Sequence, residues 1–324
     1  MRSMSLWMLI GPVTGIATWA SLRYAATTTT SSTAAASTRM GLAPVIALSH
    51  GGGPLPLLGD PGHKSIIHSL SHRIPKILSL NDPDRRPRAI ILITAHWSTA
   101  APTISGAANP DLIYDYYGFP PETYELKYPA RGDPGIAAEA AAAFRAEGLG
   151  DVVVDPGRGW DHGVFVPMTL VRPEADIPIV QMSVLASEDP TSHLRMGRAL
   201  RALRAENIAI VGSGFASFHN LRAMMAMRSS AGSRNPEGAR IQAISREWNS
   251  ALTDVVDKNP WQGLEGWRSL PGADLMHPPR GGEHFMPLIA CAGAAHEEEK
   301  VRWYTDEYLG VDIYTYYWGG SDVE

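Results

Sequence analysis

The chain of 324 residues contains a single cysteine, Cys291. No intrachain disulfide can therefore form, and zinc sites built from several thiolates are excluded. Cys291 lies in an apolar stretch beside Ile289 and Ala290, which is typical of a small buried residue. Any metal ion bound by this chain would have to be held by histidines and carboxylates.

Strong positive charge is also missing. The formal net charge is -5, and no stripe of Lys and Arg runs along the chain, so a nucleic-acid partner is not expected. No P-loop and no H-E-x-x-H motif occurs, and the Gly212-Ser213-Gly214 segment has the spacing of neither a nucleophile elbow nor a dinucleotide loop. With 44% hydrophobic and 19% charged residues, the composition is that of a soluble globular protein.

Acidic residues are absent from the first 59 positions, which contain Arg2, Arg23 and Arg39. Residues 27–38 form a Ser/Thr/Ala tract that cannot build a core. We expect residues 1–39 to be a disordered targeting leader and residues 40–324 to be the catalytic domain. The composition favours a mitochondrial leader. A secretory signal is the rival, translation from Met40 would leave the protein cytoplasmic, and no membrane association is expected for the mature domain.

Apolar runs alternate with helical segments after the leader, which predicts an α/β fold: a single domain with a central mixed β-sheet flanked by helices. The expected buried strands are 43–48, 88–94, 177–184 and 207–211, with a short strand at 152–154 and a terminal strand pair at 301–308 and 311–317. The expected helices are 63–80, kinked or started again at Pro75, and 133–147, 189–204, 242–256 and 283–295. Residues 102–131 are expected to form a long ordered loop, and residues 228–237 a polar insertion.

Five histidines lie in glycine-rich or small-residue settings, most of them close to an apolar run. His50 and His96 directly follow the first two strands, and parallel strands place such loops at one edge of the sheet. This pair is the strongest local indication of a metal site at the carboxyl ends of the strands. From local context alone His162, His219 and His284 are equally compatible with structural roles.

The other histidines lack such settings. His63, His68 and His72 are expected on the solvated face of a helix, and His193, His277 and His296 at the surface. Asp161 could orient a neighbouring imidazole. A hydrolytic triad of Ser213, His219 and Asp161 has no support in the spacing.

These motifs, taken together and in order, resemble the class III extradiol ring-cleavage dioxygenases of the LigB type, in particular the branch similar to DOPA 4,5-dioxygenase. The resemblance covers about residues 43–317 and rests on the segments Ser-His-Gly-Gly-Gly-Pro, Thr-Ala-His-Trp, Asp-His-Gly, Phe-His-Asn-Leu and Glu-His-Phe-Met-Pro-Leu. Tyr-Gly-Phe-Pro at 117–120, Tyr-Pro-Ala at 128–130 and the segment 177–183 are also similar to that branch.

The resemblance implies one divalent metal ion in a cleft at one end of the sheet, with O2 as co-substrate and a small catechol as substrate. His50, His96 and His284 match the metal-ligand positions. His219 matches the histidine with an acid/base role, which some members place close enough to the metal to count as a ligand. His162 matches a second histidine of the pocket. The Tyr-rich loop could line the substrate or pack against the core.

A third imidazole at position 284 departs from the two-histidine, one-carboxylate site common among iron oxygenases. Three neutral ligands favour an anionic catecholate. We expect Fe(II) for turnover, with Zn(II) as the other metal such a site would take. Glu283 is adjacent and could replace His284 as the ligand.

Two other classes of function remain open from the sequence. The same histidines could activate water in a zinc hydrolase, or the chain could be a binding scaffold without turnover, although the full set of five histidines argues against a scaffold. The number of subunits is not specified by any of these features.

Overall fold

The structure, a computed structural model, describes residues 41–229 and 236–323. An eight-stranded mixed sheet forms its centre, with the strand order β4-β3-β5-β2-β6-β1-β8-β7. The strands are β1 (Val45–Ser49), β2 (Ala89–Thr99), β3 (Thr103–Ser105), β4 (Val153–Asp155), β5 (Ile179–Leu185), β6 (Ile208–Gly214), β7 (Val301–Tyr308) and β8 (Val311–Trp318). The expected α/β class and mixed sheet are thus confirmed.

The four central strands β5, β2, β6 and β1 are mutually parallel. They are nearly continuous apolar runs because helices cover both faces of the sheet. The antiparallel strands β8 and β7 extend the sheet beyond β1, as the terminal strand pair predicted, and β3 pairs antiparallel with β5. Since β1, β2 and β6 are parallel neighbours, the segments that follow them emerge at one edge of the sheet.

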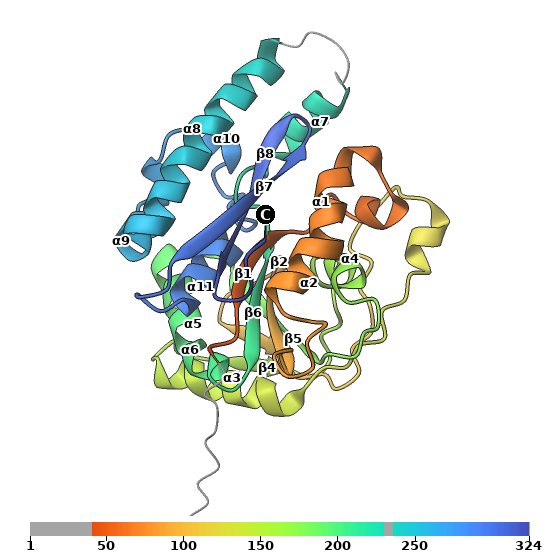
Figure 1. Cartoon of the computed structure of the whole chain (residues 1–324), viewed down its shortest axis with the longest axis vertical. Coiled ribbons are helices and arrows are strands. Elements are labelled where there is room, and N and C mark those ends of the chain that lie inside the picture. The colour runs from red at the N-terminus through yellow and green to blue at the C-terminus, as the bar shows by residue number, and fades with distance from the viewer. Residues whose placement is uncertain (1–40, 230–235, 324) are drawn as a thin grey trace, which may run out of the picture. The chain divides into compact units, whose positions relative to one another are not determined.

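Helices on the two faces belong to different parts of the chain (Figure 1). On one face α11 (Met286–Ala294) packs on β6, β1 and β2 and contacts α5 (Pro190–Ala199). On the other face α4 (His162–Val171) packs on β2 and β6, beside the helical run formed by α1 (Lys64–His68), a π-helical turn (Ser69–Arg73) and α2 (Ile74–Ile77). The remaining helices are α3 (Pro134–Ala146), α6 (Arg201–Arg204), α7 (Leu221–Ser229), α8 (Pro236–Lys258), α9 (Pro260–Glu265) and α10 (Ala273–Met276).

Several expected boundaries shift. The helix expected at 63–80 starts again at Ile74, with Pro75 in the first turn of α2, after the π-helical turn Ser69–Arg73. The loop 102–131 contains β3 and a 3-10 turn (Pro121–Tyr124). The apolar segment after His162 is the helix α4. The predicted leader lies outside the described residues, as does most of the polar insertion, of which α7 and α8 occupy the ends.

Three histidines expected at the surface or on a solvated face are buried. His193 accepts a hydrogen bond from the Leu185 backbone N–H and donates to the Asp189 carbonyl. His277 donates to the Ala216 carbonyl, and His63 bonds Asp60 and the Gly52 amide. These rings lie beside strands or loops whose backbone groups need partners, which their local sequence does not reveal. His68 and His72 are exposed as expected. None of the helices formed by the described residues has the length and apolar character to span a bilayer.

The close approach of α5 and α11 depends on two glycines. A Cβ atom at Gly197 would lie 1.9 Å from the Ala290 carbonyl oxygen, and one at Gly293 would lie 2.1 Å from the Leu194 carbonyl oxygen. The two helix backbones are therefore in direct contact, and α5 fixes the position of α11 on the sheet.

We expect Gly197→Ala to lower the free energy of unfolding by about 2 kcal/mol, because the methyl group would meet rigid backbone. An alanine in a helix ordinarily stabilises by about 0.5–1 kcal/mol, so the sign itself is diagnostic. Urea unfolding monitored by circular dichroism measures the change. Gly266→Ala, at the C-cap of α9, is the control, since a Cβ atom there would meet nothing closer than 3.8 Å. Equal stability of the two variants would contradict the close helix contact.

Candidate metal centre

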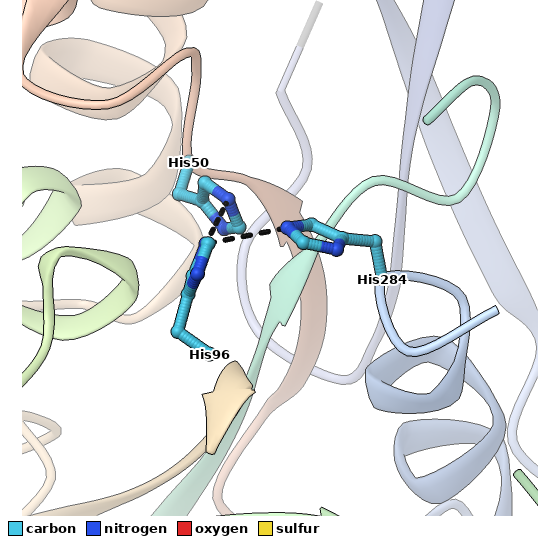
Figure 2. Close-up of side chains that lie close together, drawn as sticks. All are labelled: His50, His96 and His284. Atoms are coloured by element: carbon cyan, nitrogen blue, oxygen red, sulfur yellow. Dashed lines mark hydrogen bonds between the residues drawn. The ribbon is translucent and has the colours of Figure 1, made fainter. Parts of the chain in front are cut away.

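Three of the five histidines meet at the carboxyl edge of the sheet (Figure 2). His50 directly follows β1, His96 lies near the end of β2, and His284 precedes α11. The Nε2 atom of His96 is 3.2 Å from Nε2 of His50 and 3.2 Å from Nε2 of His284. The rings therefore converge on one point through the same ring nitrogen.

An irregularity in β2 aims His96 at this point. The pairing with β5 shifts register between Thr94 and Ser98, as at a β-bulge, which turns side chains from their regular alternation. The Thr94 hydroxyl accepts a hydrogen bond from the His96 backbone N–H at 3.1 Å and donates to the Asp161 carboxylate at 2.7 Å. The irregular segment is thereby fixed to a buried carboxylate.

Asp161 was expected to orient a neighbouring imidazole, but its carboxylate oxygens accept hydrogen bonds from other side chains. They accept from Thr94, from the Arg158 guanidinium at 2.9 Å and from the Gln181 amide at 2.8 Å. No hydrogen bond joins the Asp161 side chain to a ring nitrogen of the described histidines. Its carboxylate supports the end of β2 rather than a ring.

The position of His284 depends on close packing against the end of β6. The His284 carbonyl accepts a hydrogen bond from the Phe215 backbone N–H at 2.9 Å. A Cβ atom at Gly214 would lie 2.3 Å from the same carbonyl oxygen. Glycine at 214 thus lets the turn before α11 approach the sheet edge closely enough for the imidazole to reach His96.

The partners of Nδ1 fix the protonation of two of the three rings. The Ser213 hydroxyl donates its proton to the Gly163 carbonyl, so His50 Nδ1, at 3.0 Å, must donate to this hydroxyl oxygen. His284 Nδ1 donates to Glu283 at 2.9 Å, because a carboxylate only accepts. His50 and His284 therefore turn Nε2 lone pairs toward the common point, where Nε2 of His96 meets both, while His96 Nδ1 faces the Asp115 carboxylate at 3.5 Å.

Three ring nitrogens at this separation can hold a divalent cation between them once none of them carries a proton. A metal ion bound at about 2.0–2.1 Å from each nitrogen would hold the nitrogens roughly 3 Å apart, which agrees with the observed spacing. Burial is also the largest cause of a low pKa at all three rings. The pKa of His50 and that of His284 lie well below the ordinary value for histidine, and the pKa of His96 is lowered to about 3. The imidazoles stay neutral, as metal ligands must. The three residues fit a divalent metal ion.

The two remaining histidines flank this centre. The His219 ring, in the loop after β6, stacks on His284 with centroids 3.4 Å apart and 13° between the planes. The His162 ring, at the start of α4, lies against His96 with centroids 3.8 Å apart. Burial, followed by the nearby His162, lowers the pKa of His219 to about 4. His219 is therefore neutral near pH 7.

Asp115 is a site residue that sequence reasoning missed. One of its oxygens accepts from both the Nδ1 atom and the backbone N–H of His162, each at 2.9 Å, while the other faces His96. This carboxylate orients His162 with Nδ1 protonated and Nε2 free. Its only signal in the sequence is an acidic side chain between two tyrosines, Tyr114 and Tyr116, inside the loop.

Glu283 forms a similar connection on the other side of the centre. Its Oε1 atom accepts from His284 Nδ1 and lies 3.7 Å from His219 Nδ1. Glu283 thus lies on the Nδ1 side of His284, whereas the common point of the three rings lies on the Nε2 side. Each ligand-type imidazole, His96 and His284, is accordingly paired with a pocket histidine and a carboxylate.

Three tyrosines of the loop donate their hydroxyl protons to backbone carbonyls. Tyr114 donates to the Leu126 carbonyl, Tyr116 to Thr123 and Tyr128 to Arg172. The Tyr116 ring is also 5.8 Å from His162. Tyr116 thus both packs against the core and lines the site, whereas Tyr117 is 90% exposed.

Comparisons with known proteins agree with this geometry. The model of a family described as the catalytic LigB subunit of aromatic ring-opening dioxygenase matches residues 44–314. A protein of Beta vulgaris named 4,5-DOPA dioxygenase extradiol is 34% identical over 217 residues, which cover 67% of this chain and 76% of that protein. A protein of the same name from Escherichia coli K12 is 31% identical over 275 residues, covering 82% of this chain and 89% of its own.

A solved structure is also similar. The crystal structure of an uncharacterised protein from Escherichia coli K12 superposes with a TM-score of 0.64 at 26% identity and covers 85% of this chain and 99% of its own. The sheet and its helices are therefore shared with a solved protein over most of the length.

We expect Ser213→Ala to weaken the affinity for a divalent metal by about 10–100-fold. Without the serine hydroxyl, His50 Nδ1 has no acceptor, so neither the ring orientation nor the tautomer of His50 is fixed. Competition with a chromophoric chelator measures the dissociation constant. Ser245→Ala is the control: Ser245 is a buried serine of α8 whose hydroxyl has no partner among the described residues. A Ser213→Ala affinity equal to that of the wild type would show that this hydrogen bond does not support the centre.

Proposed function

This chain belongs to the class III extradiol dioxygenases of the LigB type, in the branch similar to DOPA 4,5-dioxygenase, and we propose that it opens the ring of a DOPA-like catechol next to the diol, with O2 as co-substrate. The observation that carries the proposal is the convergence of the Nε2 atoms of His50, His96 and His284 on one point, with Nδ1 of His50 and of His284 protonated. Such a centre leaves the side opposite the three rings for a substrate.

The proposed metal ligands are His50, His96 and His284. Fe(II) is proposed for turnover, because ring opening with O2 requires a redox-active ion, and Zn(II) would fill the same neutral ligand set without supporting it. The bound ion would bring catechol and O2 together and lower the pKa of the catechol hydroxyl. Glu283 is not favoured as a replacement for His284, because its bonded oxygen lies on the Nδ1 side of that ring.

His219 is proposed to accept the catechol proton at Nε2 and to return it later. Its neutral state and its stacking on His284 place an uncharged base at the edge of the centre. His162 is proposed to contact the substrate through Nε2, because its Nδ1 donates to Asp115. The two pocket histidines would thus bind from opposite sides, His219 beside His284 and His162 beside His96.

Hydrolysis is the other candidate that the histidine centre would allow. A zinc-bound water could be activated at the same three residues. A serine triad has no such basis, because the Ser213 hydroxyl is engaged with His50 and Gly163 and not with His219. Membership of this family favours ring opening over hydrolysis as the reaction, and the following experiment distinguishes the two.

We expect the protein reconstituted with Fe(II) without oxygen to consume O2 and form a yellow product when DOPA and air are added. An oxygen electrode and the visible absorption of the product measure this. The zinc-loaded protein is the control and should do neither. Absence of O2 uptake with every catechol tested, together with hydrolysis of ester substrates by the zinc form, would replace the proposal with the hydrolase.

We expect His219→Ala to reduce kcat by at least about 100-fold while retaining one metal ion per chain, because general base catalysis contributes on this order. His50→Ala should instead lose the metal. Metal content by atomic absorption and kcat by O2 uptake distinguish the two variants. Loss of metal from His219→Ala would make His219 a ligand rather than a base.

A further inference from the structure

A run of three glycines follows His50, one of the proposed metal ligands. β1 ends at Ser49, so the strand fixes the backbone before His50, whereas Gly51 and Gly53 follow it with φ angles of +82° and +54°. Glycine has more backbone freedom than any other residue, so such a segment keeps one shape only when other groups hold it. The direction of the His50 ring therefore depends on what contacts this glycine loop (residues 51–53).

His63 holds the middle of the glycine loop. Its Nε2 atom accepts a hydrogen bond from the Gly52 backbone N–H at 2.9 Å, and its side chain is fully buried. The imidazole lies against the Tyr308 ring, with the centroids 4.5 Å apart. A Cβ atom at Gly52 would lie 3.3 Å from the Tyr308 hydroxyl oxygen and 3.4 Å from His63 Nε2. The loop is thus packed against a buried histidine that also provides it with an acceptor.

Asp60 fixes the protonation of His63. A backbone N–H can only donate, so Nε2 of His63 must be the acceptor and Nδ1 must carry the proton. Nδ1 donates to Asp60 Oδ2 at 2.7 Å, and Asp60 Oδ1 accepts from the Arg228 guanidinium, on α7, at 2.9 Å. Burial, as the largest cause, lowers the pKa of His63, so the ring is neutral near pH 7. These contacts select the tautomer of His63 that can accept from Gly52.

The other two rings of the centre also have a hydrogen bond that fixes their backbone. The His96 N–H donates to the Thr94 hydroxyl at 3.1 Å, and the His284 carbonyl accepts from the Phe215 N–H at 2.9 Å. For His50 the corresponding bond lies in the glycine loop, two residues further along the chain. It is made by a side chain from a 3-10 turn (Pro61–His63) that precedes α1.

We propose that His63 is a positioning residue of the metal centre, which keeps His50 directed at the common point by accepting the hydrogen bond of the Gly52 amide. The inference rests on the proposed function, because it takes His50 as a ligand of the catalytic metal ion. His63 has no direct contact with the ion or the substrate in this role and acts through the backbone of the glycine loop. Loss of its acceptor would let the loop relax and would weaken the bond from His50 to the ion.

The test compares the zinc affinity of variants of the full chain, by competition with a chromophoric chelator and without catechol. We expect His63→Leu to weaken zinc binding about tenfold, because leucine has no acceptor for the Gly52 N–H. His63→Gln should stay within about threefold of the wild type, since its side-chain amide offers an acceptor for Gly52 and a donor for Asp60.

His193→Leu is the matched control. His193 is equally buried and also accepts from a backbone N–H, that of Leu185, but this bond lies at the end of β5, which carries none of the five histidines. The variant should lower the stability of the fold and leave the zinc affinity within about twofold of the wild type, because the two sites share no partners.

The visible absorption of bound Co(II) gives a second readout, because its bands depend on the geometry of the ligands. At saturating Co(II), His63→Leu should alter the spectrum, whereas His63→Gln and His193→Leu should reproduce that of the wild type. A wild type that consumes no O2 with any catechol would contradict the proposed function, and the zinc and cobalt measurements would still decide the role of His63.

Three results would overturn the inference. Equal losses of zinc affinity in His63→Leu and His63→Gln would show that the hydrogen bond to Gly52 does not support the centre. Equal losses in His63→Leu and His193→Leu would show a general effect of stability on metal binding. Unchanged affinity and an unchanged cobalt spectrum in His63→Leu would leave His63 a purely structural residue.

Asp60→Asn is the milder variant, and it decides the question where His63→Leu does not fold. The asparagine amide can donate to Nδ1, which allows the tautomer of His63 that has a proton on Nε2 and cannot accept from Gly52. We expect the zinc affinity to fall about threefold, less than for removal of a direct partner of a ligand. An affinity equal to that of the wild type would count against the positioning role.

Discussion

The imidazole nitrogens that face one point are held there because the opposite nitrogen of each ring faces an acceptor, and this requirement organises the whole site. His50 donates to a serine hydroxyl, His284 donates to a carboxylate, and His96 faces the Asp115 carboxylate at 3.5 Å. Ser213 meets the requirement only because its own proton goes to the Gly163 carbonyl, at the start of α4. One helix on each face of the sheet thereby takes part: α4 through Gly163, and α11 through the turn that carries His284.

Burial acts in the same direction as these hydrogen bonds. Removing the rings from water disfavours imidazolium, so a proton does not compete with a metal ion for the Nε2 lone pairs near neutral pH. The carboxylates that orient the outer rings remain partly exposed, and their charges offset that of a divalent ion. The centre thus combines neutral ligands with negative charge one layer outside them, which differs from a site where a carboxylate binds the metal directly.

The sequence allowed the sheet and the convergence of the first two histidines to be predicted, because strand ends in a parallel arrangement share an edge. His50 is such a strand-end residue, but His96 lies inside β2, which continues to Thr99, and the irregularity that turns its side chain inward has no evident signature. His284 was identified through resemblance, since its place depends on the contact of Gly214 with a turn 70 residues later. Asp115 was missed because its role arises only when the Tyr-rich loop folds back over α4. The buried His63, His193 and His277 were misassigned because backbone partners supplied by distant segments cannot be read from neighbouring residues.

The three rings of the centre come from positions 50, 96 and 284, and so from segments that are far apart along the chain. Few of the contacts between them can form before the sheet is complete, because closing such long loops is entropically costly. An ion that binds only when the three histidines have come together would then stabilise the folded state of the entire domain. At a free concentration 100 times its dissociation constant it would add about 2.7 kcal/mol to the stability of the folded state. Cellular supply of the ion would in that case govern how much folded protein persists, as well as how much of it is active.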